Sequence, residues 1–115
     1  MTIYKRGDIV LVEFVFASGD GIKRRPGLVL STESYHKARQ ELIMAAITSN
    51  IARKLPGETI LPHWQDAGLL YPSTVTAVIQ TIKANMVKRK LGRIVDEDMK
   101  VVENNIGKVI GFKCN

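Results

Sequence analysis

The sequence contains little cysteine, little histidine and no long hydrophobic run. The single cysteine, Cys114, can form no disulfide within the chain, which fits a reducing compartment. No apolar run approaches the roughly 20 residues that cross a bilayer, and the N-terminal residues show no apolar signal core. At 115 residues the chain can form one domain with its own core. We therefore expect a cytoplasmic protein of one domain that has no membrane partner.

The motifs that hold common cofactors are also absent from the sequence. There is no glycine-rich phosphate loop, no pair of cysteines or histidines at metal-ligand spacing, and no nucleophile elbow. The two histidines, His36 and His63, could serve as an acid/base pair only if the fold brought them together. These absences argue against a metal enzyme, and we expect no metal and no cofactor.

Positive charge is in excess. The chain has 17 Lys and Arg against 11 Asp and Glu, a formal net charge of +6 and a pI of about 9.7. The cations are spread over residues 5–6, 23–25, 53–54 and 88–93 rather than collected in a tail. This excess favours a polyanion or an acidic protein as the partner, although many small cytoplasmic proteins are mildly basic without one.

The stretch from Gly21 to Ser31 places three cations, Lys23, Arg24 and Arg25, directly before an apolar segment. Because like charges repel, a fold that gathers them at the start of a strand has an anion to hold, and our working hypothesis is a nucleic-acid phosphate. Pro26 favours an extended Arg25, which we expect to be the last residue of a loop. A guanidinium can contact a phosphate at two points. The alternative interpretation is a solvated basic turn.

Short apolar segments separated by turns make up most of the remaining sequence. They predict strands at residues 9–16, 27–31, 42–48, 58–62, 73–82 and 86–94. The near-continuous apolarity of 9–16 predicts burial on both faces, the proline in 58–62 predicts a sheet edge, and the Met and Ala content of 42–48 would also suit a helix. The polar segment 32–40 predicts about one helical turn.

Only the C-terminal segment has a helical pattern. Asp96 is a candidate N-cap and Gly111 a candidate C-terminal cap. The apolar stripe between them consists of Met99, Val102, Ile106, Val109 and Ile110. The whole pattern predicts a mainly β fold with a C-terminal helix, in the form of a small β-barrel covered by that helix.

Cleavage of RNA by its own 2′-hydroxyl is one reaction that these residues could support without a metal. It requires a site that holds one phosphate, stabilises added negative charge and moves a proton on each side. Arg25 could stabilise the charge, and Thr48, at the end of a neighbouring predicted strand, could hydrogen-bond the same phosphate. A guanidinium gives up a proton reluctantly, so Arg25 suits electrostatic stabilisation better than acid catalysis. Asp20, in the loop before the basic stretch, is the nearest carboxylate that could act as the base.

Four short motifs follow one another along the chain. They are Gly7-Asp8-Ile9-Val10, Arg25-Pro26-Gly27-Leu28-Val29-Leu30, Ala45-Ala46-Ile47-Thr48-Ser49 and Gln80-Thr81-Ile82. Each motif is weak alone, but their order and spacing, with the terminal helix, resemble the MazF/PemK (Kid) toxins of type II toxin–antitoxin systems. The resemblance extends over essentially the whole chain and indicates a single MazF/PemK-like domain at residues 1–115.

The resemblance implies an SH3-like β-barrel that forms a homodimer. It implies an endoribonuclease that cuts single-stranded RNA at short sequences without a metal, and an acidic, partly disordered antitoxin as partner. The arginine of the family's Arg-Pro motif falls on Arg25, and the threonine that closes the third strand falls on Thr48. An acidic residue in the preceding loop of some members falls near Asp20, although that loop varies in length. PemK-like members also use a histidine in this loop, and residues 17–21 contain none.

Other residues are candidates for binding RNA. They are cationic or polar and lie in or beside the predicted strands: Lys23, Arg24, Ser49, Arg53, Lys54, Gln80 and Thr81. The cations could contact phosphates and the last two residues could contact base edges, but solvated turns and an ordinary polar strand end would explain the same residues. Trp64 could stack on a base or cover a core. We interpret the basic run 88–90 as a solvated strand face.

Two other functions fit the same sequence. One is a catalytically inactive SH3-like module that binds nucleic acid or an acidic peptide, because a fold does not by itself confer activity. The other is a toxin directed against DNA gyrase, as proposed for relatives of this fold. Replacement of Arg25 separates the first of these from an enzyme, since only an enzyme has turnover to lose.

Overall fold

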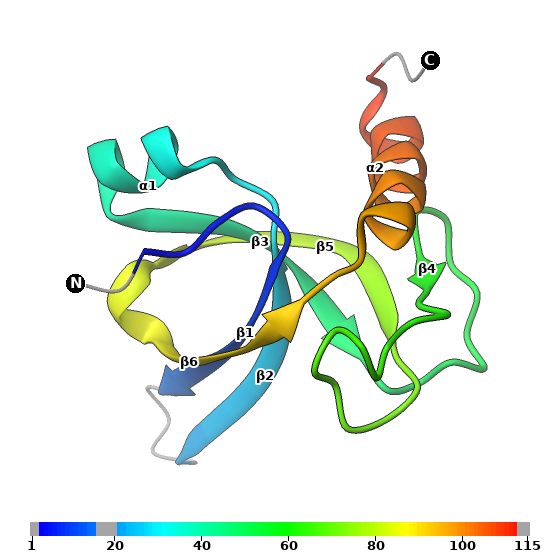
Figure 1. The fold of residues 1–115 in the computed structure, drawn as a ribbon, viewed down its shortest axis with the longest axis horizontal. Coiled ribbons are helices and arrows are strands. Elements are labelled where there is room, and N and C mark those ends of the chain that lie inside the picture. Colours follow the sequence, from blue (N-terminus) through cyan, green and yellow to red (C-terminus); the bar gives the residue numbers. More distant parts are fainter. Residues whose placement is uncertain (1–2, 16–20, 113–115) are drawn as a thin grey trace.

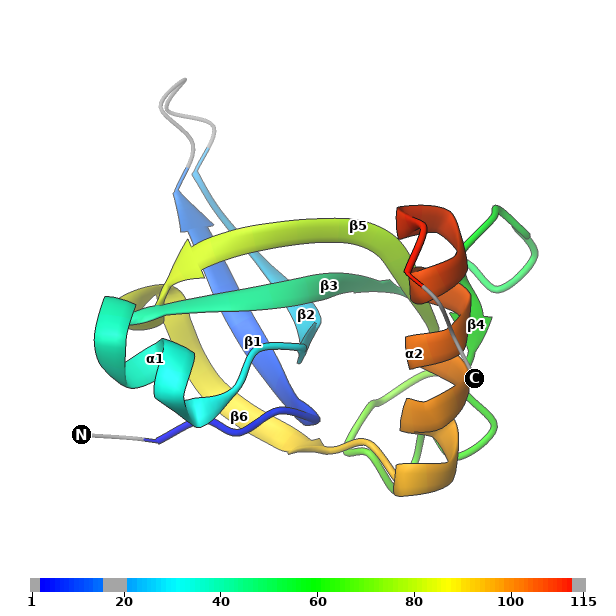
Figure 2. The same ribbon diagram turned by 90° about the horizontal axis from the view of Figure 1, so that it is seen from above.

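The fold is one antiparallel sheet with a long C-terminal helix. The computed structural model describes residues 3–15 and 21–112. Its elements are β1 (Asp8–Val15), β2 (Ile22–Val29), α1 (Glu33–Arg39), β3 (Glu41–Thr48), β4 (Thr59–Ile60), β5 (Thr74–Lys83), η1 (Ala84–Met86), β6 (Val87–Arg93) and α2 (Asp96–Ile110). The strands form one sheet in the order β4-β5-β3-β2-β1-β6. Figures 1 and 2 show β3 and β5 side by side, with α1 and α2 at opposite ends of these strands. A mainly β fold with a C-terminal helix is thereby confirmed.

The sheet is curled but is not the closed barrel that the sequence predicts. Within the described residues, β4 and β6 are its two edges and do not pair with each other. The loop between β4 and β5 packs over the end of β6 instead. A Cβ atom on Gly68 of this loop would lie 2.1 Å from the carbonyl oxygen of Leu91, and one on Gly92 would lie 2.2 Å from the carbonyl oxygen of Ala67. Two glycines therefore allow a loop contact at a place where a closed barrel would have strand pairing.

Both faces of β1 are buried at its start, as its continuous apolarity predicts. Ile9 belongs to a core that includes Val102 of α2, whereas Val10 and Val12 belong to a second core. Trp64 packs against the first core. The tryptophan thus covers the core rather than facing the candidate site described below.

Helix α2 keeps most of its predicted features. It ends at Gly111, which has the left-handed φ of 95° expected of a C-terminal cap. The N-cap is Val95 rather than the predicted Asp96, which instead lies in the first turn, where a carboxylate still stabilises the positive end of the helix dipole. The predicted apolar stripe is buried at Met99, Val102 and Ile106 and exposed at Val109 and Ile110. None of the helices described is long and apolar enough to cross a membrane.

Two predicted boundaries are wrong. Strand β2 begins at Ile22 and not at Gly27, because residues 22–26 pair with β1 in a hairpin, so Arg25 lies within a strand opposite Val12. Helix α1 has seven residues where the sequence predicts one turn. Phe16, Asp20 and Cys114, on which predictions above depend, lie outside the described residues.

Thr74 generates a prediction about stability. Its side chain is fully buried, and among the described residues its hydroxyl has no hydrogen-bonding partner. A buried hydroxyl without a partner is destabilising, so Thr74→Val should raise the free energy of unfolding by about 1 kcal/mol in urea denaturation. Thr59→Val is the matched control, because the Thr59 hydroxyl accepts a hydrogen bond from Asn105 Nδ2 at 2.7 Å, and should lower that free energy by a similar amount. Equal losses in both variants would show that Thr74 has a partner.

Candidate functional site

An open groove of about 950 Å³ lies on the sheet. Residues of β1, β2, β3, β5 and β6 line it, together with the loops that connect β3 to β4 and β4 to β5. Its polar and charged lining consists of Arg24, Arg25, Thr48, Ser49, Arg53, Tyr71, Ser73, Thr76, Gln80, Arg89 and Lys90. No aspartate, glutamate or histidine of the described chain lines it. The groove is therefore a basic surface that suits an anionic ligand.

Arg25 and Thr48 lie just beyond the point at which β2 and β3 stop pairing. The two strands pair at Val29 with Met44, at Leu28 with Ala45 and at Gly27 with Ala46, and the pairing ends there. Arg25 and Thr48 each lie two residues beyond the last pair, Gly27 with Ala46, and both line the groove. Because side chains alternate along a strand, each residue projects from the same face as its own member of that pair, and paired residues share a face. The two predicted catalytic side chains thus share one face of the sheet and one groove.

The hydroxyl of Thr48 is oriented by its own backbone. It accepts a hydrogen bond from the Asn50 amide at 3.1 Å, just after β3 ends. A hydroxyl has one proton to donate as well as lone pairs that accept, so this contact leaves its proton for another acceptor. Thr48 is therefore suited to donate to an oxygen of a bound phosphate.

Ion pairs hold some of the groove cations but not Arg25. Three are held by carboxylates outside the groove: Arg24 by Glu13 at 3.0 Å, Arg53 by Glu58 at 2.7 Å and Lys90 by Asp8 at 3.2 Å. In the described part of the chain, Arg25 and Arg89 have no carboxylate partner, and Arg25 donates only a 3.4 Å hydrogen bond to the Arg24 carbonyl. Arg25 is also exposed. Its charge is therefore available to a ligand.

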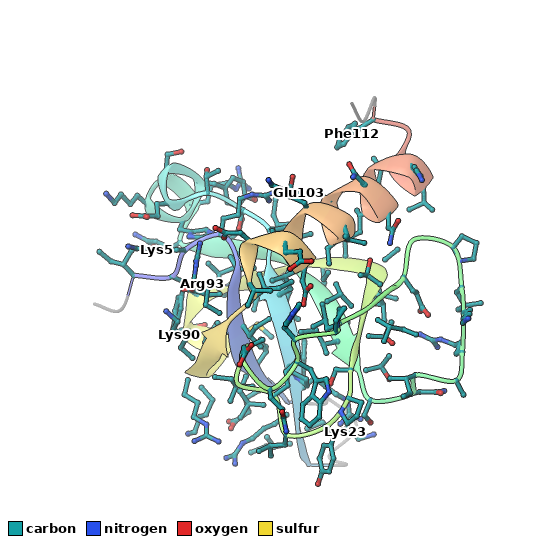
Figure 3. All side chains as sticks on the ribbon, turned by 45° about the vertical axis from the view of Figure 1, so that its right-hand side comes forward. Lys5, Lys23, Lys90, Arg93, Glu103 and Phe112 are labelled. Atoms are coloured by element: carbon teal, nitrogen blue, oxygen red, sulfur yellow. The ribbon has the colours of Figure 1, made fainter. Side chains whose placement is uncertain are left out.

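The cations on β6 have two roles: some contact Asp8, some line the groove, and Lys90 does both. Lys90 and Arg93 both contact the buried carboxylate of Asp8, the latter at 3.3 Å. Figure 3 shows these two side chains on the same side of the molecule as Lys5, whereas Lys23 lies at the opposite end. Arg89, next to Lys90 in the strand, lines the groove, and Lys90 lines it as well. The predicted solvated face of residues 88–90 is thus in part a wall of the candidate site.

The structure gathers most of the predicted RNA-binding residues. Arg24, Ser49, Arg53 and Gln80 line the same groove as the predicted catalytic pair, whereas Lys23, Lys54 and Thr81 do not line it. Asp20 lies outside the described residues, so its role as a base stays a prediction.

Sequence reasoning missed five polar or charged groove residues: Tyr71, Ser73, Thr76, Arg89 and Lys90. Tyr71 was assigned to an ordinary loop and Thr76 to the alternating part of a strand. Only the spatial arrangement distinguishes them from other polar residues of the same type, and no local motif in the sequence could have identified them.

The two histidines do not form an acid/base pair in the groove. His36 bridges the Tyr4 carbonyl at 3.0 Å and the Ser31 hydroxyl at 2.6 Å, so it ties α1 to the segments before β1 and after β2. His63 contacts α2. No group of three or more His, Cys, Asp or Glu side chains with the geometry of a metal site occurs among the residues described.

The loop that forms one wall of the groove is anchored through His63. Its Nδ1 lies 3.1 Å from Oδ1 of Asp98, a buried residue in the first turn of α2, and its backbone amide donates to Oδ2 at 3.1 Å. The same loop continues to Leu70 and Tyr71 at the groove. The hydrogen bond and the charge of Asp98 raise the pKa of His63 above its ordinary value of 6.5, and the nearby Glu97 and Asp66 act in the same direction.

The His63 contact predicts a pH-dependent stability. Because its pKa is higher in the folded than in the unfolded state, the contact contributes fully below about pH 6.5 and its contribution is lost as the pH rises through the folded-state pKa. The free energy of unfolding should therefore fall in urea titrations as the pH rises above about 6.5, and His63→Asn should remove this part of the fall. Identical pH profiles for the two proteins would contradict the assignment.

Known proteins resemble this chain in sequence family and in fold. The family described as "PemK-like, MazF-like toxin of type II toxin-antitoxin system" matches residues 5–110. No curated protein sequence matches the chain.

Among solved structures, a MazE–MazF crystal structure from Deinococcus radiodurans has a TM-score of 0.81 and 20% identity, covering 97% of this chain and 100% of its own. An endoribonuclease from a mycobacterial species has a TM-score of 0.78 and 14% identity, covering 100% and 98%. The Mycobacterium tuberculosis toxin MazF-mt6 has a TM-score of 0.74 and 25% identity, covering 93% and 99%. The structural similarity confirms the fold, and the family match over nearly the whole chain shows that this protein belongs to the PemK-like, MazF-like toxins of type II toxin–antitoxin systems.

Proposed function

We propose that this toxin is an endoribonuclease that cuts single-stranded RNA at short sequences without a metal ion. The observation that carries the proposal is the groove itself, which is lined by Thr48 and by Arg25, an arginine without a carboxylate partner among the described residues. A groove of this kind binds a phosphate and stabilises charge that develops on it. The similarity to a mycobacterial structure named as an endoribonuclease supports the same activity.

In the proposed reaction the 2′-hydroxyl oxygen of the RNA attacks the adjacent phosphorus atom. A bond forms between that oxygen and phosphorus, and the bond from phosphorus to the 5′-oxygen of the next nucleotide breaks. The products are a 2′,3′-cyclic phosphate and a 5′-hydroxyl end. Arg25 stabilises the additional negative charge on the phosphoryl oxygens, and Thr48 donates a hydrogen bond to one of them.

Two protons must move in this reaction. The base takes the proton of the 2′-hydroxyl, and an acid protonates the departing 5′-oxygen. Neither role suits Arg25, because a guanidinium gives up its proton reluctantly. Asp20 precedes β2 by two residues and is our proposed base.

The other groove residues would hold the RNA on either side of the cut. Arg24, Arg53 and Arg89 can contact neighbouring phosphates, and Ser49 and Gln80 can hydrogen-bond base edges. Lys23, Lys54 and Thr81 would act on parts of the RNA outside the groove.

We also propose two protein partners. A MazE–MazF complex is among the similar structures, and the basic groove suits an acidic, partly disordered antitoxin that would compete with RNA. The second partner is another copy of this chain. Exposed apolar side chains outside the groove lining, Ile60 on β4, Ile79 on β5 and Ile110 on α2, are candidates for residues that a second copy could cover.

The activity is tested with a long single-stranded RNA in excess EDTA. The protein should produce discrete cuts with 5′-hydroxyl ends, and Arg25→Ala should cut at least about 100-fold more slowly, since loss of one charge-stabilising donor typically costs that much. RNA affinity should fall far less than the rate.

Arg39→Ala is the matched control for this experiment. Arg39 is an exposed arginine on α1, bound to Glu41 at 2.9 Å and away from the groove lining, so its variant should cut at the normal rate. Intact RNA with a folded, RNA-binding protein would instead support the inactive binding module. Intact RNA with blocked supercoiling would support a gyrase-directed toxin.

The proposed dimer is tested by the molar mass in solution, measured by light scattering across a range of concentrations. The mass should equal two chains of 12.8 kDa at micromolar concentration. A mass of one chain at every concentration would exclude the homodimer.

A further inference from the structure

The ladder between β3 and β5 is interrupted beside the groove. It runs in one register from Glu41 with Lys83 as far as Ala45 with Ile79, and it resumes at Ile47 with Val75. Between these two pairs, β3 contributes the single residue Ala46, whereas β5 contributes residues 76–78. Strand β5 therefore bulges, and a bulge re-aims the side chains on either side of it.

The Thr76 hydroxyl spans this interruption. It donates to the Ala46 carbonyl oxygen at 2.7 Å and accepts from the Val78 amide at 3.1 Å, so both its donor and its acceptor capacity are used. Its residue is only 3% exposed, so water cannot readily replace these bonds. The Thr76 side chain thus links Ala46 of β3 to residues 76 and 78 of the bulge in β5.

Ala46 is also the residue at which the pairing of β2 with β3 ends. It pairs with Gly27, two residues from Arg25, and it lies two residues before Thr48. A shift of the Ala46 peptide would therefore move one of these side chains relative to the other. Thr76, Ala46, Arg25 and Thr48 all line the same groove.

We propose that Thr76 is a positioning residue of this site. Its hydroxyl fixes the Ala46 carbonyl at the bulge, and thereby sets the placement of Thr48 relative to Arg25. This inference rests on the proposed function for its kinetic consequence but not for its structural one. It predicts an effect on the reaction step, because small misplacements of reacting groups lower rates far more than affinity.

The kinetic test uses a short RNA that spans a cleavage site mapped with the unmodified protein. Thr76→Val keeps the side-chain shape and removes the hydroxyl. It should lower the single-turnover rate at saturating RNA by about tenfold or more. Its affinity for the same RNA carrying a 2′-deoxy nucleotide at the cut should change by less than about threefold. Thr76→Ser, which restores the hydroxyl, should recover most of the rate.

Thr74→Val is the matched control, because it makes the same substitution two residues away in the same strand at a buried residue that does not line the groove. It should cut at the normal rate. Thermal unfolding establishes that each variant is folded at the assay temperature. Should Thr76→Val fail to fold, Thr76→Cys takes its place with the same criteria, since a thiol is a weaker donor of similar size.

An RNA-free measurement separates the two proposals. In ¹H–¹⁵N spectra, Thr76→Val should shift the amide signals of Arg25, Gly27 and Thr48, and Thr74→Val should leave those of Arg25 and Gly27 in place. If the unmodified protein cuts no RNA, the proposed function fails and the spectra alone decide the positioning role. Thr76→Val cutting at the normal rate, or leaving the Arg25 and Thr48 signals unchanged, would overturn it.

Discussion

The candidate site depends on the point at which β2 and β3 stop pairing. Up to Gly27 and Ala46 the two strands form a regular ladder, and beyond it they diverge. Pro26 lies at this point and has no amide hydrogen with which to extend the ladder. Arg25 remains paired to β1 on its other side, so the divergence exposes its side chain without releasing its backbone. A rigid strand end of this kind can hold a charged side chain at a defined position.

The charges around the groove follow one pattern. Carboxylates that hold groove cations come from residues outside the groove, namely Glu13, Glu58 and Asp8, and Asp8 is almost completely buried. No described carboxylate reaches Arg25. The ion pairs therefore hold Arg24, Arg53 and Lys90 in place, while the charge of Arg25 is left to a ligand. This arrangement concentrates positive potential where a phosphate would bind.

Much of the fold could be predicted from the sequence because its strands are marked by local patterns. Residues 42–48 and 73–82 are apolar and β-branched between clear turns, and they form β3 and β5 nearly as expected. The start of β2 could not be predicted, because residues 22–25 are exposed, three of the four are basic, and they are held in a strand by their hairpin partner β1. The N-cap of α2 was missed by one residue, and helix ends depend on such local geometry.

The candidate site could be predicted only in part, because local motifs mark some of its residues and long-range contacts place the others. Arg25 and Thr48 are carried by short motifs that can be read along the chain. Thr76 lies at a bulge in β5, and Arg89 lies where the pairing of β6 with β1 shifts register, and no sequence period encodes either feature. Tyr71 reaches the groove because a loop is held by His63 and Asp98, which are far apart in the sequence. Long-range register and loop anchoring determine which polar residues become part of the site.

The central claim is that Arg25 and Thr48 act on the same phosphate. A double-mutant cycle tests it most directly, with Arg25→Lys, Thr48→Val and the combined variant compared for single-turnover cleavage of one defined RNA. These mild substitutions leave rates that can be measured. If both side chains stabilise the same transition state, the combined loss should be clearly smaller than the product of the single losses. Losses that multiply without coupling would show that the two residues act independently, and would contradict the site described here.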